Sequence, residues 1–152
     1  MDDLTAGDAL LRCGIDIAQV RRRLPAVEPF AVPVRLAPRW FRATWAKGIV
    51  AVTTPRAIYV DADVYRRLVG AEAATEGGHP TGSKRDGLLM VHELTHLEQY
   101  RRLGAGRHIR RYVGDYLSGR FRGRRHWDAY RDIGLEREAR DVAAGFDGPT
   151  PR

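Results

Sequence analysis

The chain has 152 residues, and its 26 Lys and Arg side chains outnumber its 19 Asp and Glu side chains to give a formal net charge of +7. The length suits a single domain, and the 43% hydrophobic and 30% charged residues exclude a disordered chain, a collagen and a membrane bundle. The single cysteine, Cys13, excludes an internal disulfide and a cysteine-based zinc cluster. The N-terminus lacks the features of a secretory signal, and no apolar run could span a membrane, so we expect a cytoplasmic protein.

The N-terminal segment, residues 1–38, predicts one helix and one strand. Apolar side chains at helical spacing predict an amphipathic helix over residues 8–24, weakened by Gly14 and ended by Pro25. Prolines continue to the end of the segment and leave room only for a short edge strand within Val32–Leu36. The segment could also cover a substrate cleft as an inhibitory element.

The clearest strand signal lies in residues 48–60. Two runs of β-branched residues flank a turn at Thr54-Pro55-Arg56, and this pattern predicts a β-hairpin. A helical turn is expected over residues 63–69. Residues 71–84 are polar and rich in glycine, so they predict a loop.

After that loop the sequence predicts helices. Asp86 is expected to cap a helix that continues to about Leu103 and ends at the following glycines. Further helices are expected over residues 108–117, 127–130 and 135–146. Because strands precede helices, we predict an α+β fold: a small antiparallel sheet or hairpin, an active-site helix and further C-terminal helices in one domain, residues 1–152.

The first of these later helices carries His92-Glu93-Leu94-Thr95-His96, an H-E-x-x-H motif. Residues four apart share one face of a helix, so His92 and His96 can direct their imidazoles at one metal ion. Glu93 lies about 100° further round the helix, where it could act as general base for a water activated by zinc. The alternative is that both histidines are core or surface residues that bind no metal.

The last predicted helix offers two carboxylates as the third ligand that a catalytic zinc usually has. Glu136 shares a face with Ala139 and Ala143, and two alanines would let this helix approach the motif helix closely. Glu138 groups instead with Asp141 on a face that looks solvated. We therefore favour Glu136 over Glu138; the alternative is a surface helix with ion pairs and no metal.

The two helices together resemble a known family. The run from His92 to Gln99, followed by Leu135-Glu136-Arg137-Glu138-Ala139, is similar to the gluzincin zinc metallopeptidases. Within this family, the chain most resembles the small, single-domain minigluzincins and related uncharacterised bacterial proteins with an H-E-x-x-H-x-x-Q helix. The resemblance covers residues 46–146 and implies a zincin-like fold, a bound Zn²⁺ and hydrolysis of peptide bonds in a protein or peptide substrate.

The resemblance also implies a role for each matching residue. It implies His92, His96 and Glu136 as zinc ligands, with Glu93 as general base. One position departs from the family: larger gluzincins commonly carry an acid four residues after the ligand glutamate, where it supports a ligand histidine, and this chain has Arg140 there. Either the next residue, an aspartate, takes this role, or the support is weaker.

Peptide hydrolysis also needs a group that stabilises the developing oxyanion. The side chains available between the motif and the third ligand are Tyr112, Tyr116, His126 and Tyr130. We favour Tyr130 because it is closest in sequence to Glu136. The alternative for each of these side chains is packing in the core.

The excess positive charge is concentrated in residues 101–125. This segment contributes +8, so the remaining 127 residues sum to −1. Its arginines are Arg101, Arg102, Arg107, Arg110, Arg111, Arg120, Arg122, Arg124 and Arg125. Arginines interleaved with aromatic residues suit an acidic partner or a nucleic acid. The alternative function is therefore a nucleic-acid-binding or protein-binding module with a retained but non-catalytic zinc site; a solvated helical face is the simpler interpretation.

Overall fold

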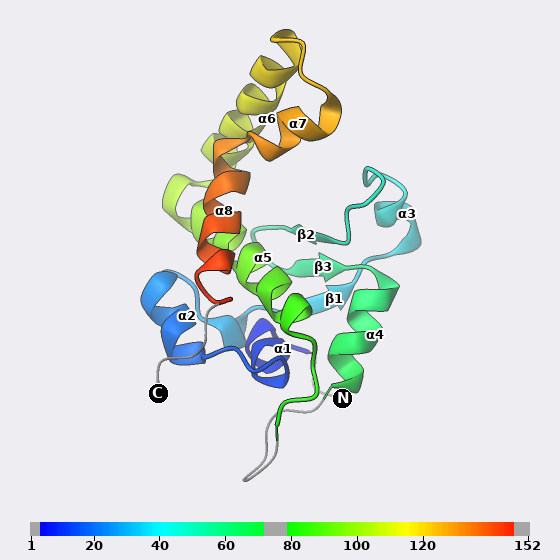
Figure 1. Cartoon of the computed structure of the whole chain (residues 1–152), viewed down its shortest axis with the longest axis vertical. Helices are drawn as coiled ribbons and strands as arrows, with labels where there is room; N and C mark the ends of the chain where they lie inside the picture. The colour runs from blue at the N-terminus through cyan, green and yellow to red at the C-terminus, as the bar shows by residue number, and fades with distance from the viewer. Residues whose placement is uncertain (1–3, 72–78, 148–152) are drawn as a thin grey trace.

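The structure is a computed structural model that describes residues 4–71 and 79–147 (Figure 1). The fold is α+β, with a small mixed sheet and helices that precede and follow it. Residues 72–78 of the predicted loop lie outside the described residues, and residues 79–83 form neither helix nor strand. Within the described ranges, no helix combines the length and the apolar character needed to cross a membrane.

The N-terminal segment forms two helices, α1 (Ala6–Arg12) and α2 (Ile17–Arg23), so the prediction of one helix over residues 8–24 is wrong. Gly14 lies between them with a φ of 71°, a conformation that ends a helix and that glycine adopts without strain. The side chain of Asp16 then caps α2. Both helices contribute buried side chains to the same hydrophobic core as the sheet.

Three short strands form the sheet in the order β1-β3-β2. β2 (Ala51–Thr53) and β3 (Ile58–Val60) are the predicted antiparallel hairpin, and β1 (Val34–Leu36) is the predicted edge strand. β1 pairs with β3 in parallel, so the prediction of an antiparallel sheet is wrong for this pair. A short helix, η1 (Pro29–Ala31), precedes β1. After β1 the chain crosses to β2, at the opposite edge of the sheet, through a long connection that contains α3 (Arg39–Arg42), a helix that the sequence analysis did not predict.

Helix α5 (Lys84–Leu103) is central and contacts α1, β2, α6 and α8. Its apolar residues Met90, Val91, Leu94 and Leu97 are at most 1% exposed, because the helix is covered on more than one side. The predicted helix is therefore confirmed, and its motif lies in the interior of the protein.

Asp86 does not cap α5 as predicted, because the helix begins two residues earlier with Ser83 at the N-cap. Its buried carboxylate accepts two hydrogen bonds from Arg67, each 2.8 Å long. Arg67 belongs to α4 (Ala62–Gly70), a helix of nine residues where a single turn was expected. The ion pair joins α4 to the first turn of the motif helix.

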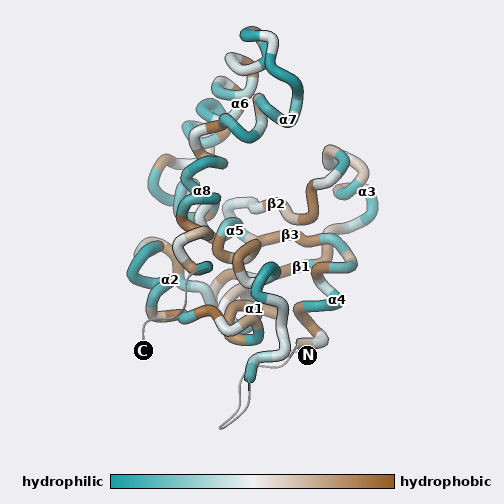
Figure 2. Tube along the Cα trace, in the orientation of Figure 1, coloured by the Kyte–Doolittle hydropathy of each residue, from teal (hydrophilic) through white to brown (hydrophobic). Residues whose placement is uncertain are grey.

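The three predicted C-terminal helices are α6 (Ala105–Phe121), α7 (His126–Arg131) and α8 (Gly134–Ala144). In Figure 1, α6 and α7 project from the rest of the protein, and α8 returns alongside α5. Figure 2 shows apolar residues concentrated along β1, β3 and α5, and mainly hydrophilic residues along α6 and α7. The return of α8 brings the second half of the predicted site against the motif helix.

Gly87 allows the N-terminal segment to pack closely on α5. A Cβ at this position would lie 2.8 Å from Cβ of Cys13 and 2.8 Å from Cγ1 of Ile15. Both neighbours are buried, so neither can move away into solvent.

We expect Gly87→Ala to lower the free energy of unfolding by about 1–3 kcal/mol, because the added methyl group overpacks this contact. The matched control is Gly114→Ala in α6, where nothing lies within 4 Å of the new Cβ. This control should raise the free energy of unfolding by about 0.5–1 kcal/mol through helix propensity alone. Urea denaturation measures both, and equal changes would contradict the packing.

Candidate metal centre

Three side chains from two helices converge at one point. His92 and His96 of α5 hold their Nε2 atoms 3.1 Å apart, as expected for residues one helical turn apart. The two carboxylate oxygens of Glu136, in the first turn of α8, lie 3.2 Å from Nε2 of His92 and 3.3 Å from Nε2 of His96. Among the described residues, this group of His and Glu side chains could hold a metal ion.

Small residues let α8 approach α5 at this point. Ala139 and Ala143 share a face of α8 with Glu136, and all three are buried. Without longer side chains on this face, the backbones of α5 and α8 come close enough for a carboxylate to reach both histidines. The structure thus brings together His92, His96 and Glu136, the three residues predicted as ligands.

Charges within this cluster shift the pKa values of its members in opposite directions. Burial alone would raise the pKa of Glu136, but hydrogen bonds with His92 and His96 outweigh burial and hold this pKa well below its usual range. Burial would lower the pKa of His96, but the hydrogen bond to Glu136 and the negative charge of Glu93 raise it to about 9. In the metal-free protein near neutral pH, an incoming metal ion must therefore displace a proton from His96.

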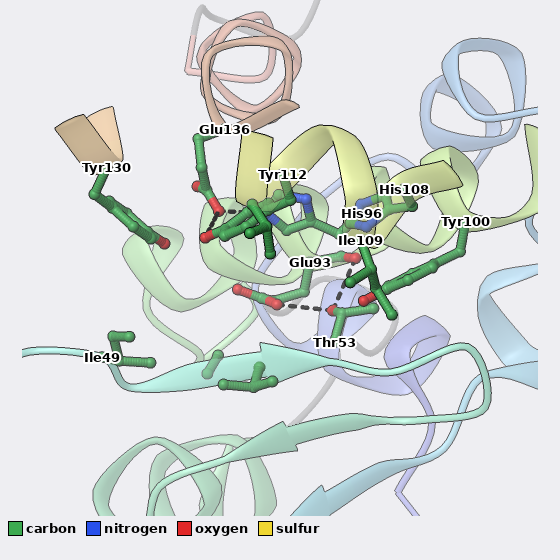
Figure 3. A pocket seen from close by; sticks show the side chains of 13 residues that line it. Ile49, Thr53, Glu93, His96, Tyr100, His108, Ile109, Tyr112, Tyr130 and Glu136 are labelled. Carbon is green, nitrogen blue, oxygen red and sulfur yellow. Dashed lines mark hydrogen bonds and ion pairs between the residues drawn. The ribbon is translucent and has the colours of Figure 1, made fainter. Parts of the chain in front are cut away.

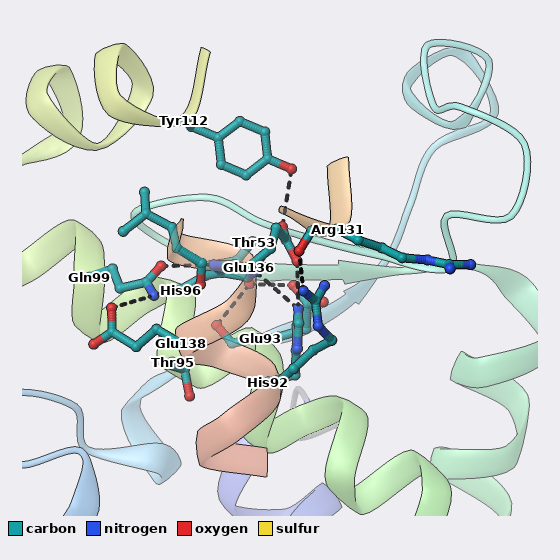
Figure 4. Close-up of polar contacts among 12 residues, drawn as sticks. Thr53, His92, Glu93, Thr95, His96, Gln99, Tyr112, Arg131, Glu136 and Glu138 are labelled. Atoms are coloured by element: carbon teal, nitrogen blue, oxygen red, sulfur yellow. Dashed lines mark hydrogen bonds and ion pairs between the residues drawn. The ribbon is translucent and has the colours of Figure 1, made fainter. Parts of the chain in front are cut away.

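Gln99 determines which nitrogen of His96 faces the cluster (Figure 4). Its amide nitrogen donates to the backbone carbonyl of Leu135 at 2.9 Å, and a carbonyl oxygen can only accept, so the amide oxygen of Gln99 must face the other way. That oxygen accepts a hydrogen bond from Nδ1 of His96 at 2.9 Å. When His96 is neutral, its lone pair is therefore on Nε2, the atom directed at Glu136.

Glu138 does not join the cluster. Its carboxylate accepts a hydrogen bond from the amide of Gln99 at 3.1 Å and forms an ion pair with Arg102 at 2.9 Å. Glu138 supports His96 only through Gln99. Of the two glutamates considered as third ligand, it is therefore Glu136, the favoured one, that lies next to the histidines.

Neither Arg140 nor Asp141 replaces the acid that larger gluzincins carry at this point. Asp141 is exposed, and Arg140 donates a hydrogen bond to the backbone carbonyl of Arg131. The contact with a histidine comes instead from Gln99. Gln99 is three residues after His96, and residues three apart lie on one face of a helix. This spacing could have predicted the contact between the two side chains from the sequence.

Glu93 lies beside the cluster and is 5% exposed. The hydroxyl of Thr53, the last residue of β2, lies 2.7 Å from Oε2 of Glu93 and 3.0 Å from its backbone carbonyl oxygen, and it donates to this residue. The contact fixes the carboxylate against the hairpin (Figure 3). Thr53 was not singled out from the sequence, since a threonine at a strand end belongs to no motif.

Two tyrosines lie on either side of Glu136 in the view of Figure 3. Tyr112 of α6 donates its hydroxyl hydrogen to Oε1 of Glu136 at 3.0 Å, and the hydroxyl of Tyr130 from α7 points toward the same carboxylate. Burial, followed by the negative charge of Glu136, raises the pKa of both tyrosines above their usual range. Both hydroxyls therefore stay protonated and can donate hydrogen bonds.

Tyr116 and His126, the other two candidates for oxyanion stabilisation, are not at the cluster. They are hydrogen-bonded to each other at 2.8 Å, where α6 meets α7. Neither lines a cavity beside Glu93.

Glu93 lines two cavities. The first has a volume of about 250 Å³ and is enclosed by β2, α5 and α6, with mainly apolar and aromatic walls that include Tyr100 and Ile109. The second has a volume of about 880 Å³ and extends past His92 toward α4 and α7. Glu93 and Tyr130 line both cavities, and residues 4–38 line neither, so the described part of the N-terminal segment does not cover them.

The arginines of residues 101–125 lie outside both cavities. Two of them are paired, Arg102 with Glu138 and Arg124 with Asp132. Within the described ranges, five others are exposed and form no ion pair: Arg107, Arg110, Arg111, Arg122 and Arg125.

Comparison of the chain with protein-family models, curated proteins and solved structures found no match.

We expect the pKa of His96 to fall from about 9 in Glu136→Gln, because the hydrogen bond and the negative charge of Glu136 no longer offset burial. The measurement is an NMR pH titration of the histidine ring signals in protein dialysed against a chelator. Glu138→Gln is the matched control, since Glu138 contacts Gln99 rather than the ring, and it should leave the pKa near that of the unmodified chain. Equal shifts in both variants would show that Glu136 does not set the charge of His96.

Proposed function

We propose that this chain is a zinc-dependent metallopeptidase of the gluzincin type. The observation that supports this most strongly is the convergence of three side chains: the two Nε2 atoms are 3.1 Å apart, one oxygen of Glu136 lies 3.2 Å from His92, and its other oxygen lies 3.3 Å from His96. Ligand atoms about 2.0–2.1 Å from a tetrahedral Zn²⁺ are separated by about 3.3 Å. With one ligand atom each, His92, His96 and Glu136 offer three donors within 4.8 Å of one another, so a small movement of the side chains would bring them to this spacing.

The chemistry of the donors also suits zinc. Two imidazole nitrogens and one carboxylate form a common ligand set of catalytic zinc sites and leave a fourth position for water or substrate. When bound, zinc would supply Lewis acidity, which polarises a carbonyl group and makes water acidic enough to lose a proton near neutral pH.

Glu93 is placed to act as general base in this proposal. It is next to the ligands without touching Glu136, and it lines both cavities, so its carboxylate can reach a water molecule that attacks from either. The hydrogen bond from Thr53 holds one oxygen, Oε2, and leaves the other to take the proton. A proton accepted there can pass to the departing amine.

Tyr130 is placed to stabilise the negative charge that develops on the substrate oxygen. Tyr130 lines both cavities and its hydroxyl stays protonated, whereas Tyr112 lines only the first cavity and its hydroxyl donates to Glu136. In this proposal Tyr112 positions the carboxylate, and Tyr130 contacts the substrate.

The position of β2 supports a polypeptide substrate. β2 is at one edge of the sheet, and on its outer side no further strand of the described residues pairs with it. An extended peptide can add to such an edge through its backbone, and its alternate side chains then point to one side. A peptide bound along β2 would pass Glu93 and both cavities.

We expect the purified chain to contain close to one zinc per molecule. Glu136→Gln should weaken zinc binding by more than about 100-fold because it removes a donor, whereas Glu138→Gln should weaken it by about tenfold or less. Elemental analysis and competition with a chelator measure these values. A chain that binds no added zinc, or a larger loss in Glu138→Gln, would contradict the assignment of the ligands.

Glu93→Gln should keep its zinc and lose proteolysis by about 10²–10⁴-fold, because an amide cannot accept the proton. Cleavage of a denatured protein or a peptide library, followed by mass spectrometry, measures the loss. Glu98→Gln is the matched control on the same helix, since Glu98 bonds the backbone of Ala26 far from the cluster, and it should cleave normally. Zinc binding without cleavage of any substrate by the unmodified chain would instead support a non-catalytic module.

A further inference from the structure

Arg140 lines the larger of the two cavities at the site. It shares the wall of this cavity with His92, Glu93 and Tyr130. On α8 it lies four residues after Glu136, so both side chains leave the same face of the helix. Four residues extend about 6 Å along a helix axis. Arg140 is therefore one helical turn from the carboxylate that faces the two histidines.

The guanidinium group of Arg140 is anchored but has no acidic partner. Its Nη2 donates a hydrogen bond to the backbone carbonyl of Arg131, the last residue of α7, and the side chain is partly buried. A guanidinium group carries five N–H donors. Among the described residues, no carboxylate forms an ion pair with this one. A positive charge is thus held in the wall of the cavity with donors to spare.

The aspartates of the same cavity are engaged elsewhere. Asp61 caps α4, Asp63 pairs with an arginine of the same helix, and Asp86 pairs with Arg67. All three lie at the N-terminal ends of α4 and α5, whereas Arg140 lies on α8 beside the candidate metal centre. A ligand with a negative charge can therefore approach Arg140 without displacing one of these aspartates.

A carboxylate is the group of a polypeptide that suits this side chain best. The parallel N–H groups of a guanidinium bind the two oxygens of a carboxylate together, and such bonds are stronger than those between neutral groups. A polypeptide offers carboxylates on Asp and Glu side chains and at its C-terminus. An extended peptide advances about 3.4 Å per residue, so about 6 Å corresponds to about two residues.

We propose that Arg140 binds a carboxylate of the substrate within about two residues of the cleaved bond. The inference rests on the proposed peptidase function and adds to it the charge of the substrate. In this proposal Arg140 determines specificity, and the chemistry of hydrolysis remains with Glu93 and the candidate metal centre.

The test compares peptides that differ only in charge. Each is a labelled peptide of alanines around one phenylalanine, which suits the apolar walls of the first cavity. One residue near the phenylalanine is glutamate, or glutamine in the matched peptide, and both end in an amide. A further peptide has neither and ends in a free carboxylate. Fluorescence anisotropy measures the binding of each peptide to zinc-loaded Glu93→Gln, in which cleavage is slowed.

We expect one carboxylate to strengthen binding by about tenfold over its neutral match, the scale of a charge-assisted hydrogen bond. A preference for glutamate within the peptide would assign the subsite to an acidic side chain. A preference for the free carboxylate over the amide would assign it to the end of a chain. Either result supports the proposal if it depends on Arg140.

Variants of the chain test that dependence. Arg140→Gln should reduce the tenfold ratio to about one, and Arg140→Glu should invert it in favour of peptides with lysine. If Arg140 only joined α7 to α8, its loss would weaken charged and neutral peptides equally and leave the ratio unchanged. Arg137→Gln is the matched control, because Arg137 is an exposed arginine of α8 that lines neither cavity, and it should keep the ratio.

Two results would overturn the proposal. One is equal binding of the charged and neutral peptides, or no binding of any of them at millimolar concentration. The other is a preference for the carboxylate that Arg140→Gln leaves unchanged, since Arg85 of the same cavity or the metal would then bind it.

Cleavage by the zinc-loaded, unmodified chain separates this inference from the proposed function. A chain that prefers the carboxylate but cleaves no peptide would contradict the peptidase and support the binding site. A chain that cleaves acidic and neutral peptides with equal kcat/KM would support the peptidase and overturn the role of Arg140.

Discussion

The arrangement of this protein around its candidate site depends on one contact, that of the Glu136 carboxylate with the two histidines of α5. Burying a carboxylate costs several kcal/mol unless it is paired, and here it faces two imidazoles at 3.2 and 3.3 Å. For this contact to form, α8 must pack on α5 through small residues, and the chain must return from the projecting α6 and α7. The rest of the site is built around that pairing.

Contacts from several elements hold the side chains of the site. Gln99 links His96 to the backbone of α8, Tyr112 of α6 donates a hydrogen bond to Glu136, and Thr53 of β2 donates one to Glu93. Because α8, α6 and β2 all take part, His96, Glu136 and Glu93 are oriented before any ion or substrate arrives. Such preorganisation is what a catalytic metal site requires.

The surface of α6 has a different character. Its buried face supplies Tyr112 to the site, and the partly exposed Ile109 and Val113 line the cavity beside Glu93. The arginines of residues 101–125 lie outside the cavities, at the end of α5, on α6 and in the connection from α6 to α7.

Local patterns were sufficient for most of the elements and for the group of His92, His96 and Glu136, which could hold a metal ion. The spacing of four between His92 and His96 and the alanines beside Glu136 depend only on helical geometry, so they were predictable without a fold. The single helix over residues 8–24 was mispredicted because apolar periodicity continues across Gly14, although its positive φ ends the helix. The cap at Asp86 was mispredicted because its partner, Arg67, is 19 residues away in the sequence.

By itself, the sequence determined the helical faces: which histidines align, which glutamate shares a face with small residues, and where positive charge accumulates. Only the tertiary structure decided the parallel pairing of β1 with β3, the hydrogen bond from Thr53 to Glu93, and which of the four aromatic candidates lie beside Glu136. These contacts join residues from separate elements. Their formation depends on how the elements pack, and no periodicity within one element records that.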